Sequence, residues 1–250
     1  MIADLTAAAL STTETSLQAF LLGSVDFEAA LNWQRRLVFQ VSGDRHGACL
    51  MLCEHPPSIT IGRQGSWGQL RFDVDELETR RWPVRWVNRG GGCQLHMPGQ
   101  LTAYAILPLD RLGLGLQAYL EKLQQVVADV LADFSITAER ATDRPGVWVG
   151  GRPIASFGVA VRDWVSYYGC VLNVAPDLLP FRRISCGGPS EPQMTSLACV
   201  RHGAVRLAMV RERFVEHFAA RFGFSRISVF FDHPALNKKA PSDAVAASPF

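Results

Sequence analysis

Lysine is scarce in this sequence. Of its 25 basic residues only three are lysines, at positions 122, 238 and 239, and the remaining 22 are arginines. Lys122 shares a predicted helix face with Glu121, Gln125 and Asp129, which indicates a solvated side chain, and the other two lie near the C-terminus. Because a guanidinium stays protonated, an arginine cannot act as a base. The sequence therefore offers almost no candidate for a catalytic amine.

Several other features are absent. The six cysteines include no C-x-x-C pair, and no spacing of cysteine and histidine is typical of a zinc site. No apolar run is long enough to span a bilayer, and Asp4 and Glu14 interrupt the region where a signal peptide would lie. The net charge of +2 does not favour nucleic acid. We therefore expect a cytoplasmic protein with reduced thiols, no metal or other cofactor, and no nucleic-acid or membrane partner.

The composition is that of a globular protein with a good core, with 48% hydrophobic and 19% charged residues in a chain of 250. Residues 1–16 are predicted to form a loose leader, and residues 234–250 a polar, disordered tail. Residues 17–233 are expected to form one catalytic domain. Strand-like runs and helical patterns are interspersed there, which predicts an α/β (α+β) fold with a mixed sheet flanked by helices.

The expected elements follow from hydrophobic periodicity and from turn signals. Strands are predicted at residues 17–22, 48–54, 58–61, 82–87, 101–107, 146–149, 153–161, 169–174 and 224–231. Helices are predicted at residues 27–41, capped by Asp26, and at 73–81, 116–134 and 205–222. Gly150-Gly151 is predicted to be a hairpin turn.

A glycine-rich segment, residues 88–100, separates two of these strands and reads NRGGGCQLHMPGQ. Consecutive glycines allow positive φ angles and a close approach of the backbone to a ligand, and Pro98-Gly99 is a turn signal. Taken alone, such a segment is more typical of an ordinary hairpin connection than of a site. A second segment far downstream, ISCGG at residues 184–188, favours a functional role for both.

Four segments of the chain resemble sequence blocks of the octanoyltransferase (lipoyl-protein transferase) family, which has the biotin/lipoate protein ligase-like fold. The resemblance covers roughly residues 21–231, and the order and spacing of the blocks make it specific. The matching residues are His55-Pro56-Pro57 with Ile59, Ile61, Gly62 and Arg63; Arg89-Gly90-Gly91, His96, Pro98-Gly99-Gln100 and Tyr104; Gly146-Val147-Trp148, Ile154-Ala155, Gly158, Gly169 and Leu172-Asn173-Val174; and Cys186-Gly187 with Thr195-Ser196-Leu197.

The resemblance implies an acyltransferase of lipoate biosynthesis. Family members take a medium-chain acyl group, typically octanoyl, from acyl carrier protein and hold it as a thioester on a cysteine. They then pass it to a lysine of a lipoyl domain or of the glycine-cleavage H protein. Cys186 occupies the nucleophile position, and His96 occupies an acyl-pocket position expected to face the Cys186 thiol. The positions expected to bind substrate are Arg89, Gly90, Gly91, Gly92, Pro98, Gly99, Gln100, Ile154, Ala155, Gly158, Tyr168, Gly169 and Gly187.

Two residues depart from the family pattern. Pro153 stands where the family has the lysine of K-I-A, and Tyr168 stands where it usually has a histidine. A thiol reacts as the thiolate, and its ordinary pKa of about 8.5 falls beside a positive charge that proline cannot supply. Arg152 is adjacent, but neighbouring strand residues face opposite ways, so without a bulge it should point away from the site.

His96 is then the remaining candidate for a base. We expect it to assist proton transfer when the acceptor lysine attacks, while Tyr168 or the backbone amides of Gly187 and Gly188 bind the oxyanion. The alternative roles are structural, with Cys186 an inert buried thiol and His96 a loop cap. His55, beside two prolines, is expected to be structural, and among the other cysteines Cys93 and Cys170 are candidates to line the pocket.

Besides a thiol hydrolase, for which no Cys-His-Asn/Asp arrangement can be established from spacing alone, two alternatives to an active transferase stay open at this point. One is a catalytically impaired acyl-binding or scaffold homologue, which Pro153 and Tyr168 favour, whereas Cys186, His96 and the intact glycine-rich segment favour the active enzyme. The other is an ATP-dependent lipoate or biotin ligase of the same fold. The missing lysine and the absence of a P-loop sequence count against that ligase.

Overall fold

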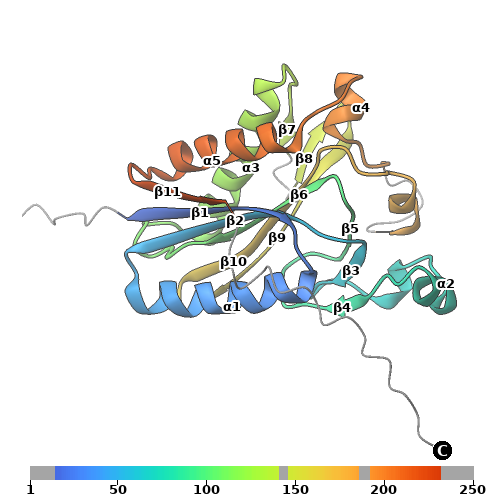
Figure 1. Cartoon of the computed structure of the whole chain (residues 1–250), viewed down its shortest axis with the longest axis horizontal. Coiled ribbons are helices and arrows are strands. Elements are labelled where there is room, and N and C mark those ends of the chain that lie inside the picture. The colour runs from blue at the N-terminus through green and yellow to red at the C-terminus, as the bar shows by residue number, and fades with distance from the viewer. Residues whose placement is uncertain (1–14, 141–145, 186–191, 232–250) are drawn as a thin grey trace, which may run out of the picture.

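An eight-stranded mixed sheet forms the centre of the computed structural model, which describes residues 15–140, 146–185 and 192–231 (Figure 1). Its strands are β1 (Ser16–Ser24), β2 (Gly47–Glu54), β6 (Gln100–Ile106), β7 (Glu139–Arg140), β8 (Gly146–Val149), β9 (Arg152–Arg162), β10 (Val165–Asn173) and β11 (Ile227–Phe231). Their order is β11-β1-β2-β6-β10-β9-β8-β7. β1 is parallel to both of its neighbours, and the other pairs are antiparallel.

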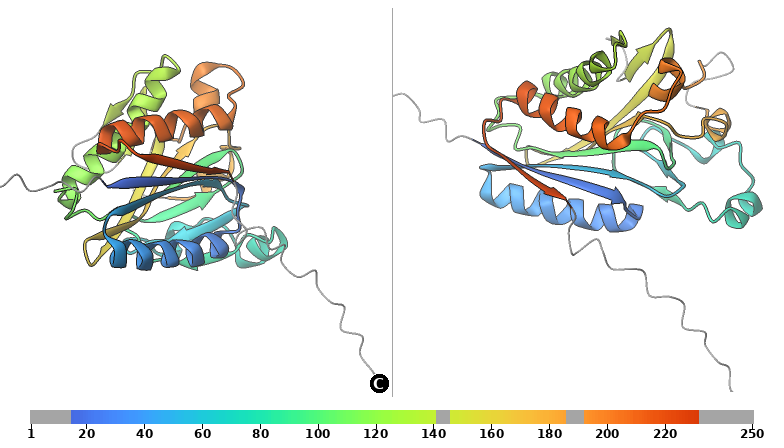
Figure 2. Two further views of the ribbon diagram at one scale, coloured as in Figure 1. Left: turned by 60° about the vertical axis from the view of Figure 1, so that its left-hand side comes forward. Right: turned by 45° about the horizontal axis from the view of Figure 1, so that its top comes forward.

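Helices cover both faces of this sheet. The α-helices of the described residues are α1 (Phe27–Asp44), α2 (Val74–Thr79), α3 (Leu116–Asp133), α4 (Leu197–Arg201) and α5 (Leu207–Phe222), of which α2 packs away from the large sheet. α1 lies along one face, whereas α3 and α5 lie side by side on the other (Figures 1 and 2). The central strands β2 and β6 are buried on both faces, which explains why their sequences are almost continuously apolar.

Asp26 starts α1. Its carboxylate accepts hydrogen bonds from the backbone N–H groups of Glu28 at 2.9 Å and Ala29 at 3.2 Å. These bonds satisfy two donors that have no partner within the helix. The buried stripe of α1, which includes Phe27 and Leu37, packs on the sheet and forms one of its two main apolar cores.

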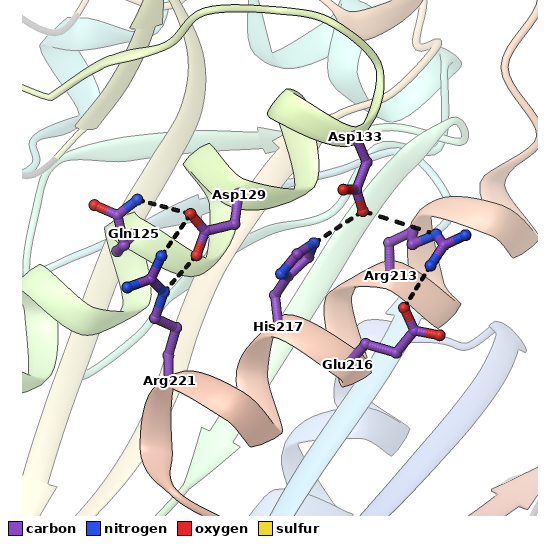
Figure 3. Close-up of polar contacts among 7 residues, drawn as sticks. All are labelled: Gln125, Asp129, Asp133, Arg213, Glu216, His217 and Arg221. Carbon is purple, nitrogen blue, oxygen red and sulfur yellow. Dashed lines mark hydrogen bonds and ion pairs between the residues drawn. The ribbon is translucent and has the colours of Figure 1, made fainter.

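Charged contacts join α3 to α5 (Figure 3). Asp129 accepts two hydrogen bonds from Arg221, at 2.5 and 2.9 Å, and Asp133 lies 2.8 Å from Nε2 of His217. Lys122 donates from Nζ to the carbonyl oxygen of Arg221 at 2.7 Å, at the end of α5 where a cation is favourable. Lys122 was expected to be solvated, but it is half-buried, and its hydrogen bond links α3 to α5.

A second sheet of three strands lies beside one end of the large sheet (Figure 1). It consists of β3 (Ser58–Ile61), β4 (Val84–Trp86) and β5 (Cys93–His96). β3 is central, parallel to β4 and antiparallel to β5. The glycine-rich segment is therefore not an ordinary hairpin connection, because β4 before it pairs with β3 in the small sheet whereas β6 after it belongs to the large sheet. Its second half is itself a strand.

The predicted fold class is confirmed, and every predicted strand and helix is found in the described residues with its ends shifted by a few positions. Gly150 and Gly151 form the predicted turn between β8 and β9. The short elements β5, β7 and α4 were not predicted. No helix in the described ranges is long and apolar enough to cross a membrane. Residues 1–14 and 232–250, which hold most of the predicted leader and tail, lie outside the described residues.

Candidate active site

A cleft with an empty volume of about 390 Å³ lies between the small sheet and strands β6, β9 and β10. Five residues predicted from the sequence to act on or bind substrate line this cleft, and they come from four separate parts of the chain. They are Arg89, His96, Gly158, Tyr168 and Gly169. Phe27 of α1 and Tyr104 of β6 also line it. The fold thus brings the second and third family-like blocks together.

His96, on β5, is almost completely buried in the cleft wall. Its Nε2 lies 3.2 Å from Oγ1 of Thr60, and its Nδ1 has no hydrogen-bond partner among the described residues. The rings of Phe27 and His55 pack against it, with centroids 5.0 and 5.4 Å away. Burial, assisted by the nearby His55 and Arg89, lowers the pKa of His96 well below its ordinary value. The imidazole is therefore neutral at neutral pH.

His55 is also buried, but both of its ring nitrogens have partners. Nδ1 lies 2.7 Å from the carbonyl oxygen of Val25, which can only accept, so Nδ1 carries the proton. Nε2 then accepts from the hydroxyl of Tyr104 at 2.8 Å. Burial lowers the pKa of His55 to about 4. These contacts agree with the structural role expected for His55, which holds Tyr104 in the cleft wall.

Arg89 carries the only full positive charge among the described residues that line the cleft. Its Nη2 donates to the carbonyl oxygen and to Oγ1 of Thr60, at 3.1 and 2.8 Å, and its Nη1 donates to the carbonyl oxygen of Gly90 at 3.0 Å. The loop carrying Arg89 rests on Gly158, where an added Cβ would come within 2.8 Å of the Gly90 oxygen. Glycine at position 158 thus allows the arginine to reach the cleft.

Tyr168 reaches the cleft through a local distortion of β10. Its φ of 58° lies in the left-handed region, and its N–H leaves the strand ladder to donate to Oε1 of the buried Gln34 at 2.7 Å. Burial raises the pKa of the phenol, which therefore stays protonated and can donate. The next residue, Gly169, lies so close to β6 that an added Cβ would be 2.3 Å from the carbonyl oxygen of Ala103.

The turn between β5 and β6 contacts protein groups and not the cleft. Gly99 has a φ of 87° and donates its N–H to Oε2 of Glu54 at 2.8 Å. Gln100 accepts from the N–H of Met97 at 2.7 Å and donates to Oδ1 of Asn173 at 2.8 Å. Other predicted substrate positions are also absent from the cleft lining, namely Gly90, Gly91, Gly92, Pro98, Ile154 and Ala155.

Pro153 lies at an irregularity in the pairing of β9 with β8, where it stands opposite Trp148. Its carbonyl oxygen accepts from the N–H of Thr195 at 2.9 Å. Arg152 donates to the carbonyl oxygens of Gln193 and Met194, at 3.2 and 3.0 Å. Arg152 is therefore engaged with backbone carbonyls and is absent from the cleft lining, although the irregular pairing here departs from the regular strand on which its outward orientation was predicted. Ile154 and Ala155 are buried in the core under α3 and α5.

Cys186, Gly187 and Gly188 lie outside the described residues. The residues on either side of that gap are held firmly. The N–H of Ser185 donates to the carbonyl oxygen of Gln69 at 2.9 Å, and the carbonyl oxygen of Thr195 accepts from Nδ2 of Asn173 at 3.0 Å. Among the described residues, no group of histidine, cysteine and carboxylate side chains is arranged to hold a metal ion.

Of the two cysteines that were candidates to line the pocket, Cys170 does so and Cys93 does not. Cys170 lines the cleft, and burial raises its pKa far above the ordinary value, so it is a poor nucleophile. Cys93 lies outside the cleft lining, with its sulfur 3.4 Å from the carbonyl oxygen of Ser66.

Sequence reasoning missed Thr60, which links Arg89 to His96. The one sequence feature that could have indicated Thr60 is its hydroxyl group, which lies between two isoleucines in a short buried strand.

Comparison with known proteins gives consistent matches. Residues 26–219 match the family model of the lipoyl protein ligase A/B catalytic domain. The octanoyltransferase of Geotalea uraniireducens (strain Rf4) is 39% identical over 192 residues, which cover 77% of this chain and 86% of that protein. The octanoyltransferase of Geobacter metallireducens is 39% identical over 203 residues, which cover 81% and 90%.

Solved structures show the same fold at lower identity. Lipoate-protein ligase A bound with ATP matches with a TM-score of 0.66 at 16% identity, covering 86% of this chain and 88% of that one. The putative lipoate protein ligase Ta0514 from T. acidophilum, with bound lipoic acid, matches with a TM-score of 0.64 at 15% identity, covering 87% and 89%. At these identities the likeness extends to the fold alone.

Proposed function

Because the chain belongs to the octanoyltransferase family of acyltransferases, within the lipoyl protein ligase A/B catalytic domains, we propose that it moves an octanoyl-type acyl group from acyl carrier protein to a lysine of a lipoyl domain or of glycine-cleavage H protein. The observation that carries this proposal is the cleft, which is lined by residues of two family-like blocks. Its walls include Phe27, Tyr104 and Val171, which suit an alkyl chain, beside the polar side chains of Arg89, His96 and Tyr168.

The proposed reaction has two steps and uses Cys186 as the nucleophile. The Cys186 thiolate attacks the carbonyl carbon of the carrier thioester, and the carrier thiol leaves as the new thioester forms. The ε-amine of the acceptor lysine then attacks that thioester, an amide bond forms, and the Cys186 thiol is released. The place of Cys186 in the family-like cysteine block, in a chain that belongs to the family, supports this assignment. Described residues on both sides of it are anchored to the fold. Ser185 is tied to Gln69, and Thr195 to Pro153 and Asn173.

Arg89 is proposed to supply the positive charge that the missing family lysine would otherwise provide. Its guanidinium is fixed by donation to Thr60 and Gly90, so it presents charge without being able to remove a proton. Tyr168 contributes a neutral hydroxyl donor at the cleft wall. Gly90, Gly91 and Gly92, outside the cleft lining, are proposed to set the path of the loop that carries Arg89.

The acyl-enzyme is tested by mass spectrometry. The protein is incubated with octanoyl-loaded acyl carrier protein, and we expect one octanoyl adduct, located on Cys186 and absent from Cys186→Ser. Addition of a lipoyl domain should then move the adduct to the domain lysine. Absence of an adduct on Cys186 would contradict the covalent route, and adduct formation without onward transfer would point to an impaired acyl-binding protein.

Pro153 is the observation that favours such an impaired homologue as the second candidate. Pro153→Lys should distinguish the two functions when compared with Pro153→Gln, which restores the backbone N–H without a charge. A decayed transferase should gain at least about tenfold in the rate of acyl transfer with lysine over glutamine, because a positioned proton-transfer group contributes on the order of 10²-fold or more. Equal rates in the two variants would indicate a site that works without the amine.

A further inference from the structure

We infer that His96 donates a hydrogen bond from a fixed Nδ1–H to the carbonyl oxygen of the bound thioester, and so stabilises the oxyanion without moving a proton. The inference rests on the proposed acyl transfer and assigns His96 a role different from that of the base expected from the sequence. Three observations carry it, namely the contact of Arg89 with Thr60, the contact of Thr60 with His96, and the unpartnered Nδ1 of His96.

The tautomer of His96 follows from the order of donors and acceptors. The guanidinium of Arg89 can only donate, so Oγ1 of Thr60 is the acceptor in their 2.8 Å contact. The hydroxyl proton of Thr60 is then directed to another acceptor. Nε2 of His96 lies at 3.2 Å, whereas the alternative, the carbonyl oxygen of Gln94, lies at 3.5 Å. The shorter contact favours Nε2 as the acceptor, which places the single proton of the neutral ring on Nδ1.

The surroundings of His96 oppose its protonation. Among the described residues, the titratable and charged groups that act on it are His55, which is itself neutral, and the cationic Arg89, with no carboxylate. Phe27 covers another side of the ring. A neutral imidazole with its pKa far below neutrality is a weak base, but its N–H remains a good donor.

The Nδ1–H is a buried donor without a protein partner, and such groups are uncommon in folded proteins. An acceptor that arrives with the substrate would satisfy it. In the proposed reaction the thioester is the acceptor, because its carbonyl oxygen becomes negatively charged when the Cys186 thiolate attacks. When the tetrahedral intermediate collapses, the carbon–sulfur bond to the carrier breaks, the carbonyl reforms, and the proton stays on Nδ1 throughout.

The tautomer is tested first, in the free protein and independently of activity. Nitrogen NMR of the protein labelled with ¹⁵N-histidine should show His96 with a protonated Nδ1 and an unprotonated Nε2, unchanged between about pH 6 and pH 9. Thr60→Val, which removes the hydroxyl, should disturb this pattern, and Thr60→Ser should keep it. A proton on Nε2 in the parent protein would overturn the inference even if the protein proves to be an active transferase.

The contact with substrate is tested with an unreactive ketone analogue of octanoyl-pantetheine. Its binding should shift the Nδ1–H signal of His96 in Cys186→Ser as well, so the result does not require acyl-enzyme formation. A bound analogue that leaves this signal unchanged would refute the contact. Failure of acylation at Cys186 with a positive NMR result would instead count against the proposed covalent route alone.

Two substitutions separate donation from base catalysis. His96→Asn places an amide N–H near the position of Nδ1, whereas His96→Gln places one near Nε2 and leaves the cleft without the donor. We expect His96→Asn to keep acylation within about tenfold of the parent, and His96→Gln to lose about 10²–10³-fold, as for removal of one oxyanion donor. Equal losses in both variants, together with a pH-dependent limb in the parent's rate profile that both variants lack, would identify His96 as a base.

Discussion

Gly158 shows how one missing side chain keeps the cleft open. At this position of β9 an added Cβ would meet the carbonyl oxygen of Gly90 at 2.8 Å and Cδ of Arg89 at 3.0 Å. The first of these atoms is backbone, so the loop itself would have to move. The guanidinium contact to Thr60 at 2.8 Å would be lost or lengthened as a result. The packing of a single glycine therefore determines where the cleft's positive charge lies.

We predict that Gly158→Ala lowers acyl-transfer activity by about 10-fold or more while the protein still folds, because overpacking at one site typically costs about 1–3 kcal/mol. Activity is measured with octanoyl-acyl carrier protein, and folding by thermal denaturation. Gly23→Ala is the matched control, since nothing lies within 4 Å of an added Cβ there. Full activity in Gly158→Ala would show that the position of Arg89 does not matter.

Single residues also mark the limit of what the sequence predicts. His96, Arg89, Tyr168, Gly158 and Gly169 were expected at the site from their places in family-like blocks, and the cleft brings all five together. The link between Arg89 and His96 through a threonine on another strand could not be expected, because it depends on the pairing of β3 with β5. Neither could the unpartnered Nδ1, which exists only once the ring is buried.

At the scale of elements, α1 contributes to the site through its first turn. Phe27, the first residue of the helix, lines the cleft and packs on both buried histidines, with ring centroids 5.1 Å from His55 and 5.0 Å from His96. The preceding residue, Asp26, caps the same turn. A frayed first turn would therefore loosen the apolar cover over the histidine pair.

We predict that Asp26→Ala lowers the free energy of unfolding by about 1 kcal/mol, the usual cost of losing an N-cap side chain. Urea denaturation at neutral pH measures this change. Asp26→Asn keeps an oxygen that can accept from the N–H groups of Glu28 and Ala29, so it should lie much closer to the parent protein. Equal destabilisation by alanine and asparagine would mean that the charge of Asp26, and not its capping bonds, supplies the stability.

The elements that were predicted correctly have strong local signals. The helix at α3 has a regular apolar stripe, and β2 and β6 have continuous apolar runs bounded by turn residues. β5 lacked such a signal, because three glycines precede it and Pro98 follows within two residues. Its strand conformation comes from pairing with β3, a contact between residues more than thirty positions apart in the chain, such as Ser58 and His96. Tertiary pairing therefore overrode local propensity.

For the whole molecule, the resemblance seen in four sequence segments is confirmed by the family match across residues 26–219. The fold brings residues of the second and third segments together in one cleft. The first two blocks run through the small sheet, the third forms β8, β9 and β10, and the described part of the fourth is anchored to β9 and to Asn173 of β10. The cleft is lined by residues of the second and third blocks and by Phe27 of α1, so its formation requires the tertiary packing of these parts.

The buried histidines also link folding of the whole molecule to pH. Burial lowers the pKa of His55 from 6.5 to about 4, and it lowers that of His96 as well. Between pH 6.5 and about pH 4, the unfolded chain binds a proton at His55 that the folded protein excludes. Stability is therefore at its full value above pH 6.5 and falls as the pH is lowered toward 4. The contribution of His55 is roughly 3 kcal/mol, at about 1.4 kcal/mol for each pH unit.

We predict that the free energy of unfolding, measured with urea at several values between about pH 7.5 and pH 4.5, decreases steadily with acidification. His55→Gln should show a shallower decrease by up to about 1.4 kcal/mol per pH unit, because glutamine does not titrate while its oxygen can still accept from Tyr104. The paired carboxylates Glu76, Asp110 and Asp129 have lowered pKa values, so their contributions change chiefly at the acidic end of this window and below it, and equally in both proteins. Parallel curves for the parent and His55→Gln would mean that His55 is already solvated enough in the folded protein to accept its proton.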